Sequence, residues 1–237
     1  MKIQLCAFLL SGVFLTVSCH KSATPLKTVN YTLSLRPDST TAHDCYVSIL
    51  DNDPADGNIN VNSAHELVLA RWTFAADNYD SATQRGYIRF DSLSKVPTNA
   101  TVTSAILYLY GEGPDSSATY PFGNSFYSGS NNPSNGALVQ MVTGGTWDQT
   151  TITWNNAPSA TAAGQDTIPP STSEWNYNVA VDVTNLVSQQ VASPATNYGL
   201  VLRLQVENIY RDMVFATSHS ADTSERPQLV VQYSVKQ

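Results

Sequence analysis

Short runs of β-branched and aromatic residues follow one another along this chain with almost no helical pattern between them. Runs of this kind, bounded by Gly, Pro, Asn or Asp, are typical of β-strands. They cover residues 31–35, 45–50, 66–74, 87–90, 102–110, 137–142, 151–154, 178–183, 198–206, 213–217 and 228–235. Only residues 183–192, VTNLVSQQVA, have the apolar spacing of a short helix. The pattern predicts an all-β protein, a single β-sandwich of the jelly-roll type with at most one short helix.

The N-terminus has the pattern of a secretion signal. Lys2 precedes the apolar run IQLCAFLLSGVFLTV, which is too short for a lasting membrane span. The run ends in LTVSC, which resembles a bacterial lipobox and implies that Cys19 becomes the lipidated N-terminus. We therefore expect a lipoprotein signal peptide at residues 1–18, a lipidated tether at 19–28 and the β-sandwich domain at 29–237. An ordinary signal peptide with an incidental Cys19 is the alternative.

This organisation places the domain outside the cytoplasm, in the cell envelope, on the periplasmic side or at the cell surface. Acyl chains on Cys19 would be its only link to the membrane. With Cys6 in the signal and Cys19 lipidated, Cys45 has no partner for a disulfide. Since Cys45 lies in the strand-like run DCYVSIL, we expect a buried and unreactive thiol.

The charge of the chain argues against nucleic acid as a partner. Lys and Arg number 12 against 19 Asp and Glu, which gives a formal net charge of −7. Nucleic acids are bound through basic surfaces that neutralise phosphates. We therefore expect no nucleic-acid partner and leave the oligomeric state open.

Several motifs in fixed order resemble one known family. They are the stretch RGYIRFDSLSKVPTNATVTSAILYLYG (85–111), the W…TWN..P pattern between Trp147 and Pro158, and shorter segments at 182–184, 199–202, 215–218 and 226–231. Together they resemble the DNRLRE-domain family, which includes a carbohydrate-binding module family that binds alginate. The resemblance implies a β-sandwich that binds polysaccharide without cleaving it, with acidic polymers such as alginate as candidate ligands.

Trp147 and Trp154 are framework residues of this resemblance and are expected to belong mostly to the core. Their spacing is odd, so one uninterrupted strand would turn them to opposite faces. They could not then form a flat platform for a sugar. A turn at residues 148–151 could bring them back to a shared side.

The candidate carbohydrate-binding residues are aromatic side chains and arginines outside that framework. Aromatic faces stack on the apolar side of a pyranose, and Arg forks bind carboxylates. The aromatic candidates are Tyr120, Phe122, Phe126 and Tyr127 in the long loop 111–136, and Trp175 and Tyr177 in SEWNYN. The arginine candidates are Arg71, Arg203 and Arg211, whereas Arg85 and Arg89 are expected in structural ion pairs.

A calcium site is a further candidate in the loop 51–65. Asp51, Asp53 and Asp56, with Asn58 and Asn60, crowd oxygen ligands into a Gly-containing loop. Their order is not that of an EF-hand, and a solvated turn is the favoured alternative. No cofactor is expected to be required, with structural calcium left open.

Signatures of catalysis are missing from the chain. It contains no GxSxG, no HExxH and no phosphate-cradling Gly loop. We expect a non-catalytic, membrane-anchored protein that binds carbohydrate. The alternatives are a structural or adhesion lipoprotein that contacts other proteins, and a polysaccharide lyase or hydrolase.

Overall fold

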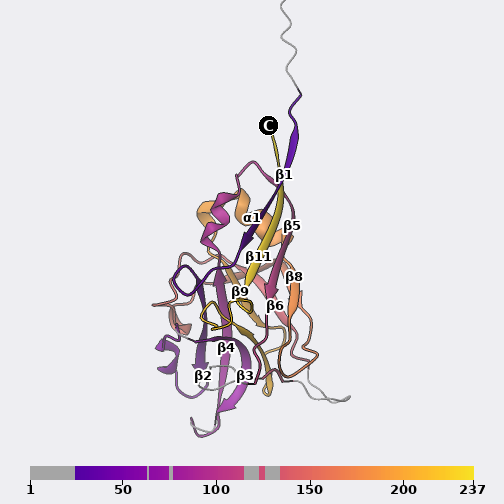
Figure 1. The fold of residues 1–237 in the computed structure, drawn as a ribbon. Coiled ribbons are helices and arrows are strands. Elements are labelled where there is room, and N and C mark those ends of the chain that lie inside the picture. Colours follow the sequence, from indigo (N-terminus) through magenta and orange to yellow (C-terminus); the bar gives the residue numbers. More distant parts are fainter. Residues whose placement is uncertain (1–24, 63, 75–76, 115–122, 126–133) are drawn as a thin grey trace, which may run out of the picture.

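The protein consists mainly of two antiparallel β-sheets (Figure 1). The computed structural model describes residues 25–62, 64–74, 77–114, 123–125 and 134–237. The four-stranded sheet contains, in spatial order, β1 (Thr28–Leu35), β11 (Gln228–Lys236), β5 (Thr101–Leu109) and β8 (Val179–Asp182). The seven-stranded sheet contains β10 (Arg211–Ala216), β3 (Glu66–Phe74), β4 (Asp80–Arg89), β9 (Leu200–Leu204), β6 (Ala137–Val142) and β7 (Ala160–Ile168), with β2 (His43–Leu50) paired to β4. The predicted all-β sandwich is confirmed.

The main core contains residues from both sheets. Leu107 of β5, Leu202 of β9 and Phe215 of β10 all belong to it and are fully buried. Gly86 of β4 allows a close approach, because a Cβ atom there would lie 2.8 Å from Cγ of Leu67. Any larger residue at this position would push β3 away from β4, so the glycine is a packing requirement.

One α-helix and four 3₁₀ turns complete the described structure. The helix α1 (Thr184–Ala192) buries Leu186, Val187 and Val191 in the main core, which confirms the helix predicted at 183–192. Among the described residues, no helix has the length and apolar character needed to cross a bilayer. The 3₁₀ turns are η1 (Asp56–Asn58), η3 (Asp91–Lys95), η4 (Trp154–Asn156) and η5 (Pro194–Thr196).

The two ends of the described chain lie side by side. Thr28 is opposite Lys236 in the β1–β11 pair, and the backbone N–H of Lys27 donates to the carbonyl of Gln237 at 2.7 Å. Figure 1 shows both ends at one extremity of the molecule, with β2, β3 and β4 toward the other. A tether before β1 would therefore leave from the end remote from these three strands.

A second hydrophobic cluster forms apart from the main core. Its buried members are Cys45, Val47, Tyr87, Val142, Trp147, Ile152 and Val201. The thiol of Cys45 is buried as predicted, and burial raises its pKa, so it is a poor nucleophile at neutral pH. Because Cys45 and Tyr87 are cross-strand partners, this cluster covers one face of the β2–β4 pair.

Candidate functional site

The segment 147–158 is a folded loop rather than the strand predicted at 151–154. Asp148 starts a turn, since its Oδ1 accepts from the N–H of Thr150 at 2.8 Å and from its hydroxyl at 2.6 Å. Thr153 and Asn156 then form a capping box around η4. Side chains that bond their own backbone compete with a sheet ladder, so this polar segment curls instead of pairing.

The turn brings both tryptophans to the same cluster. Trp147 is 8% exposed, and its indole N–H donates to the carbonyl of Tyr198 at 2.7 Å. Trp154 is only half-buried and packs against the edge of the same cluster. The expectation of a core residue is confirmed for Trp147, whereas part of the Trp154 ring remains accessible.

The loop 51–65 supports the segment that carries Trp154. The Asn60 side-chain amide donates to the carbonyls of Gln149, at 2.9 Å, and Ile152, at 2.5 Å. The Asn155 amide in turn donates to Asn58 Oδ1 at 3.1 Å. These contacts fix the position of η4 from outside the sheet.

A cavity of about 320 Å³ lies beside Trp154. Val47, Tyr87 and Val201 supply apolar surface from three strands, and Arg85 and Arg203 line it with guanidinium groups. The Arg85 guanidinium carbon lies 4.7 Å from the centre of the Trp154 ring, a cation–π distance. The cavity thus combines an aromatic wall with two charged donors.

Glu207 holds these two arginines together. Arg85 donates through Nε and Nη2 to the two Glu207 oxygens at 2.8 and 2.9 Å, and Arg203 Nη2 lies 3.2 Å from Oε2. The strand register explains the meeting: Gly86 is opposite Leu202, so Arg85 and Arg203 occupy the next positions along β4 and β9. A carboxylate is therefore already bound by two arginines at the cavity.

Two more arginines extend this group along the sheet. Arg71 is opposite both Thr83 of β4 and Arg211 of β10. Since Thr83 and Arg85 are two residues apart on β4, their side chains share a face. Arg71 donates to both carboxylate oxygens of Asp51 and to the Thr83 hydroxyl, and the hydrogen bond to Asp51 is the main cause that raises the Arg71 pKa.

We call Arg71, Arg85, Arg203 and Arg211 the arginine cluster. Asp51 and Glu207 are its paired acids, and Asp80 also acts electrostatically on Arg71, so four positive and three negative charges leave a local charge of +1. The formal net charge of the whole chain is −7. Within the described part of the chain, Nε of Arg203 and Nε of Arg211 are buried without a hydrogen-bond partner. The face is therefore a basic island on an acidic protein.

The sequence model of carbohydrate-binding module family 96 matches residues 38–233 of the chain. The chain belongs to carbohydrate-binding module family 96. No curated protein matches it. The predicted resemblance to a carbohydrate-binding module family is confirmed, while the DNRLRE-domain name and alginate as ligand stay predictions.

Membership of family 96 indicates carbohydrate binding, and the predicted arginines lie together in the module. Arg71, Arg203 and Arg211 share one cluster with Arg85, which the sequence assigned to a structural ion pair. That ion pair exists, with Glu207, yet Arg85 also lines the cavity. Arg89 pairs with Asp91 as expected, with Nε 2.6 Å from Oδ1.

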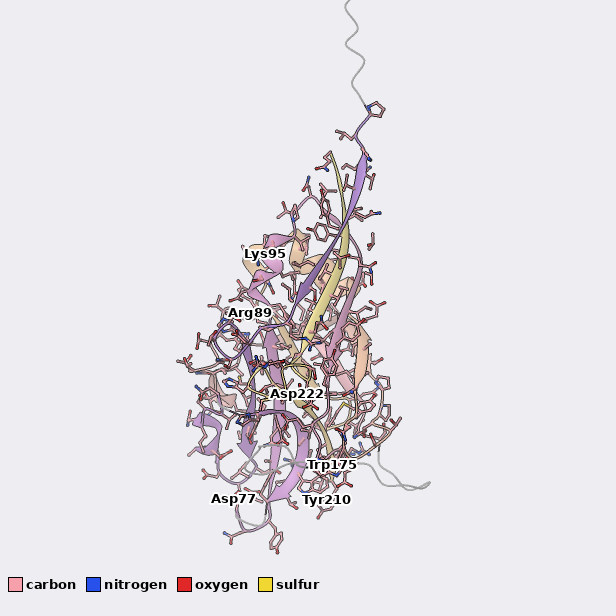
Figure 2. The ribbon with its side chains drawn as sticks, viewed as in Figure 1. Asp77, Arg89, Lys95, Trp175, Tyr210 and Asp222 are labelled. Atoms are coloured by element: carbon pink, nitrogen blue, oxygen red, sulfur yellow. The ribbon has the colours of Figure 1, made fainter. Side chains whose placement is uncertain are left out.

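The two predicted aromatic residues in the described part of the chain, Trp175 and Tyr177, do not line this cavity. Tyr177 is 7% exposed, its hydroxyl donates to the carbonyl of Pro169 at 3.0 Å, and its ring packs against Phe215. Because its ring and hydroxyl are buried in these contacts, Tyr177 belongs to the core and offers no face to a sugar. Trp175 is half-buried and lies at the end of the molecule away from β1 (Figure 2). The other aromatic candidates lie outside the described residues: Tyr120, Phe122, Phe126 and Tyr127.

The predicted calcium ligands of the module are not gathered around a common point. The Asp51 carboxylate is taken by Arg71, and Asp53 Oδ1 accepts from the N–H of Ala55 at 3.0 Å. Asp56 is half-buried, and burial raises its pKa. In the ranges that the structure describes, no group of three His, Cys, Asp or Glu side chains is placed to hold a metal ion. The loop works here as the support of η4.

Trp154, Arg85 and Glu207 are the site residues that sequence reasoning did not select. Alternation along β4 places Arg85 and Tyr87 on one face, and alternation along β9 places Val201 and Arg203 on one face. This signal was present in the sequence. What it lacked was the pairing of β4 with β9, which joins the two faces.

Proposed function

We propose that this module binds acidic polysaccharide, with polyuronates such as alginate as the ligand class, at the cavity beside Trp154. The observation that carries the proposal is the way in which Arg85 and Arg203 together hold the Glu207 carboxylate. A uronate offers the same two oxygens to the same donors. Arg forks are well suited to carboxylates because two parallel N–H groups match two oxygens.

The other features of the cavity fit a sugar ring. The accessible part of Trp154 supplies an apolar face, and Gln140 at the cavity supplies an amide whose Nε2 donates to Gln165 at 2.6 Å. A volume of about 320 Å³ is at the small end of ligand pockets. This size supports a site that takes a short part of a polymer while the rest runs along the open face.

The local charge supports an acidic polymer over a neutral one. Long-range electrostatics oppose the approach of an acidic polymer because the chain is acidic overall, although charges farther apart than the Debye length are screened. Recognition then depends on the arginine cluster at short range. We expect binding that is specific but sensitive to salt.

Binding without cleavage is the form of the proposal that the cavity supports. A lyase needs a base close to the neutralised carboxylate, and Tyr87 is a phenol that lines the cavity. Its hydroxyl donates to the carbonyl of Pro158 at 3.1 Å, and burial raises its pKa. Glu207 is engaged by both arginines. Neither group is poised to take a proton from a substrate.

The lipid anchor belongs to the same proposal. Cys19 would carry the acyl chains, and the tether would enter β1 at the end of the molecule where the C-terminus also lies (Figure 1). The domain would then stand on the membrane with the remote end facing outward. Labelled palmitate should enter the wild-type protein and not Cys19→Ser; equal labelling of both would remove the anchor.

The experiment that tests the ligand uses alginate and the same polymer after chemical reduction of its carboxyl groups. Affinity electrophoresis should show strong retardation of the protein by alginate and much weaker retardation by carboxyl-reduced alginate. Equal retardation by the two polymers would contradict the proposal. New unsaturated or reducing ends would establish an enzyme, and the absence of any glycan ligand in a wider panel would favour an adhesion protein.

A further inference from the structure

A second aromatic group lies apart from the cavity, where β3 and β10 come together. Trp72 of β3 and Tyr210, the residue before β10, have ring centroids 5.3 Å apart with an interplanar angle of 77°. Tyr210 is 54% exposed and Trp72 is half-buried. The two rings form a corner in which one ring steadies the other while apolar surface faces solvent.

The backbone at Tyr210 is strained. Its φ is +63°, in the left-handed region that bulky residues rarely adopt. The loop that leads to it is fixed: the N–H of Asn208 donates to the carbonyl of Val206 at 2.9 Å, and Arg211 Nη1 donates to the same oxygen at 3.4 Å. Strain of this kind persists where the surrounding structure enforces it, and it concentrates at ligand-binding positions.

The pair points away from the arginine cluster. Trp72 follows Arg71 in β3, and neighbouring residues of a strand face opposite sides, so Trp72 points away from the face of Arg71. Tyr210, which directly precedes β10, contacts Trp72 on that other side. Figure 2 shows Tyr210 at the end of the molecule away from β1, as it does for Trp175. Gln205 and Asn208 are both exposed and belong to the loop that leads to Tyr210.

We propose that Trp72 and Tyr210 form a second carbohydrate contact that stacks on a pyranose ring and needs no charge on the sugar. The proposal rests on the proposed function, because it takes the ligand to be a polysaccharide. A ring face against the apolar side of a sugar is the chemistry that this corner provides, and the loop before Tyr210 carries exposed amides. This second contact would retain part of the affinity when the uronate carboxyls are absent.

Because the backbone at Tyr210 is strained, its ring can be removed by a substitution that does not strain the backbone further. Glycine adopts positive φ without steric cost, so Tyr210→Gly removes the ring and releases the backbone at the same time. Tyr79 is the matched control, since it too has a positive φ, of +59°, and is 73% exposed. Tyr210→Asn serves as a second variant, because Asn also tolerates this conformation. We expect all three variants to melt within about 3 °C of wild type.

Affinity electrophoresis of the whole protein against alginate and carboxyl-reduced alginate tests the proposal. Tyr210→Gly and Tyr210→Asn should weaken binding of both polymers by a similar factor, about fivefold. Tyr79→Gly should bind like wild type. Arg203→Gln should weaken binding of alginate and leave binding of the reduced polymer unchanged.

The results separate this inference from the proposed function. Unchanged binding by both Tyr210 variants, or no retardation of wild type by carboxyl-reduced alginate, would overturn the inference and leave the arginine site standing. Dependence on Tyr210 without dependence on Arg203 would support the inference and remove the proposed arginine site. If sedimentation shows a wild-type dimer that Tyr210→Gly dissociates, with glycan binding intact, the corner is a protein contact and the inference fails.

Discussion

Ionisation of the buried Asp212 carboxyl should lower the stability of the folded protein. We therefore expect Asp212→Asn to stabilise the protein at alkaline pH. The side chain is 6% exposed, and within the described part of the chain its Oδ1 has no hydrogen-bond partner. Burial raises the pKa of Asp212 from 3.8 to about 7. The native carboxyl thus holds its proton more tightly than the unfolded one, and stability falls as pH rises from about 4 to about 7.

The size of the effect follows from the two pKa values. The difference is about three pH units, and each unit is worth about 1.4 kcal/mol, so the full cost is about 4 kcal/mol. Roughly a third of it is already present at pH 5. The advantage of Asp212→Asn over wild type should therefore grow by about 3 kcal/mol between pH 5 and pH 8, since the amide cannot ionise.

Urea unfolding of both proteins at pH 5 and pH 8, at constant ionic strength, measures this difference. Other titrating groups contribute equally to wild type and variant and cancel in the comparison. Asp77→Asn, an exposed residue at the remote end of the molecule (Figure 2), is the control and should show no growth with pH. An advantage that is equal at the two pH values would refute the reasoning, because Asp212 would then ionise as in the unfolded chain.

Three further predictions concern the site and its support. Asn60→Ala should destabilise the protein by about 1–3 kcal/mol and weaken alginate binding, since two carbonyls lose their donor and η4 loses its support; an unchanged melting temperature would contradict this. Glu207→Gln should raise the affinity for alginate about threefold at low salt and steepen its salt dependence, because one local negative charge is removed; unchanged affinity would mean that the ligand does not meet these arginines. Cys45 should resist iodoacetamide in the native protein and react after unfolding, and labelling of the native protein would show that the thiol is not buried.

The strands that the sequence predicts are those whose side chains are buried on one face or both. Residues 66–74 and 102–110 contain the β-branched and aromatic residues that a sheet surface selects, and the structure has β3 and β5 there. β7, with the sequence ATAAGQDTI, escaped prediction because Ala, Gly and Asp are poor strand formers. It lies at the end of the strand order and forms through its pairing with β6, which local preference does not encode.

The sequence predicted which types of residue form the candidate site, but not how the fold brings them together. Arg71, Arg203 and Arg211 were selected because arginine is the side chain that binds carboxylates in pairs of hydrogen bonds. Their meeting with Arg85 depends on long-range pairing of β4 with β9 and of β3 with β10. The orientation of Trp154 depends on the turn at Asp148, where side-chain hydrogen bonds overrule the strand-like pattern of TITW.

The affinity of Arg203→Gln for alginate tests the central claim most directly. This variant removes one guanidinium and leaves the pair of Arg85 with Glu207 in place. Lys95→Gln is the matched control, because it removes the same charge from an exposed position in η3, outside the strands that carry the arginine cluster. Calorimetric titration should show alginate binding at least tenfold weaker for Arg203→Gln, a loss of about 1.4 kcal/mol, and within about twofold of wild type for Lys95→Gln. Wild-type affinity in Arg203→Gln, or an equal loss in both variants, would contradict recognition of the polymer by the arginine cluster.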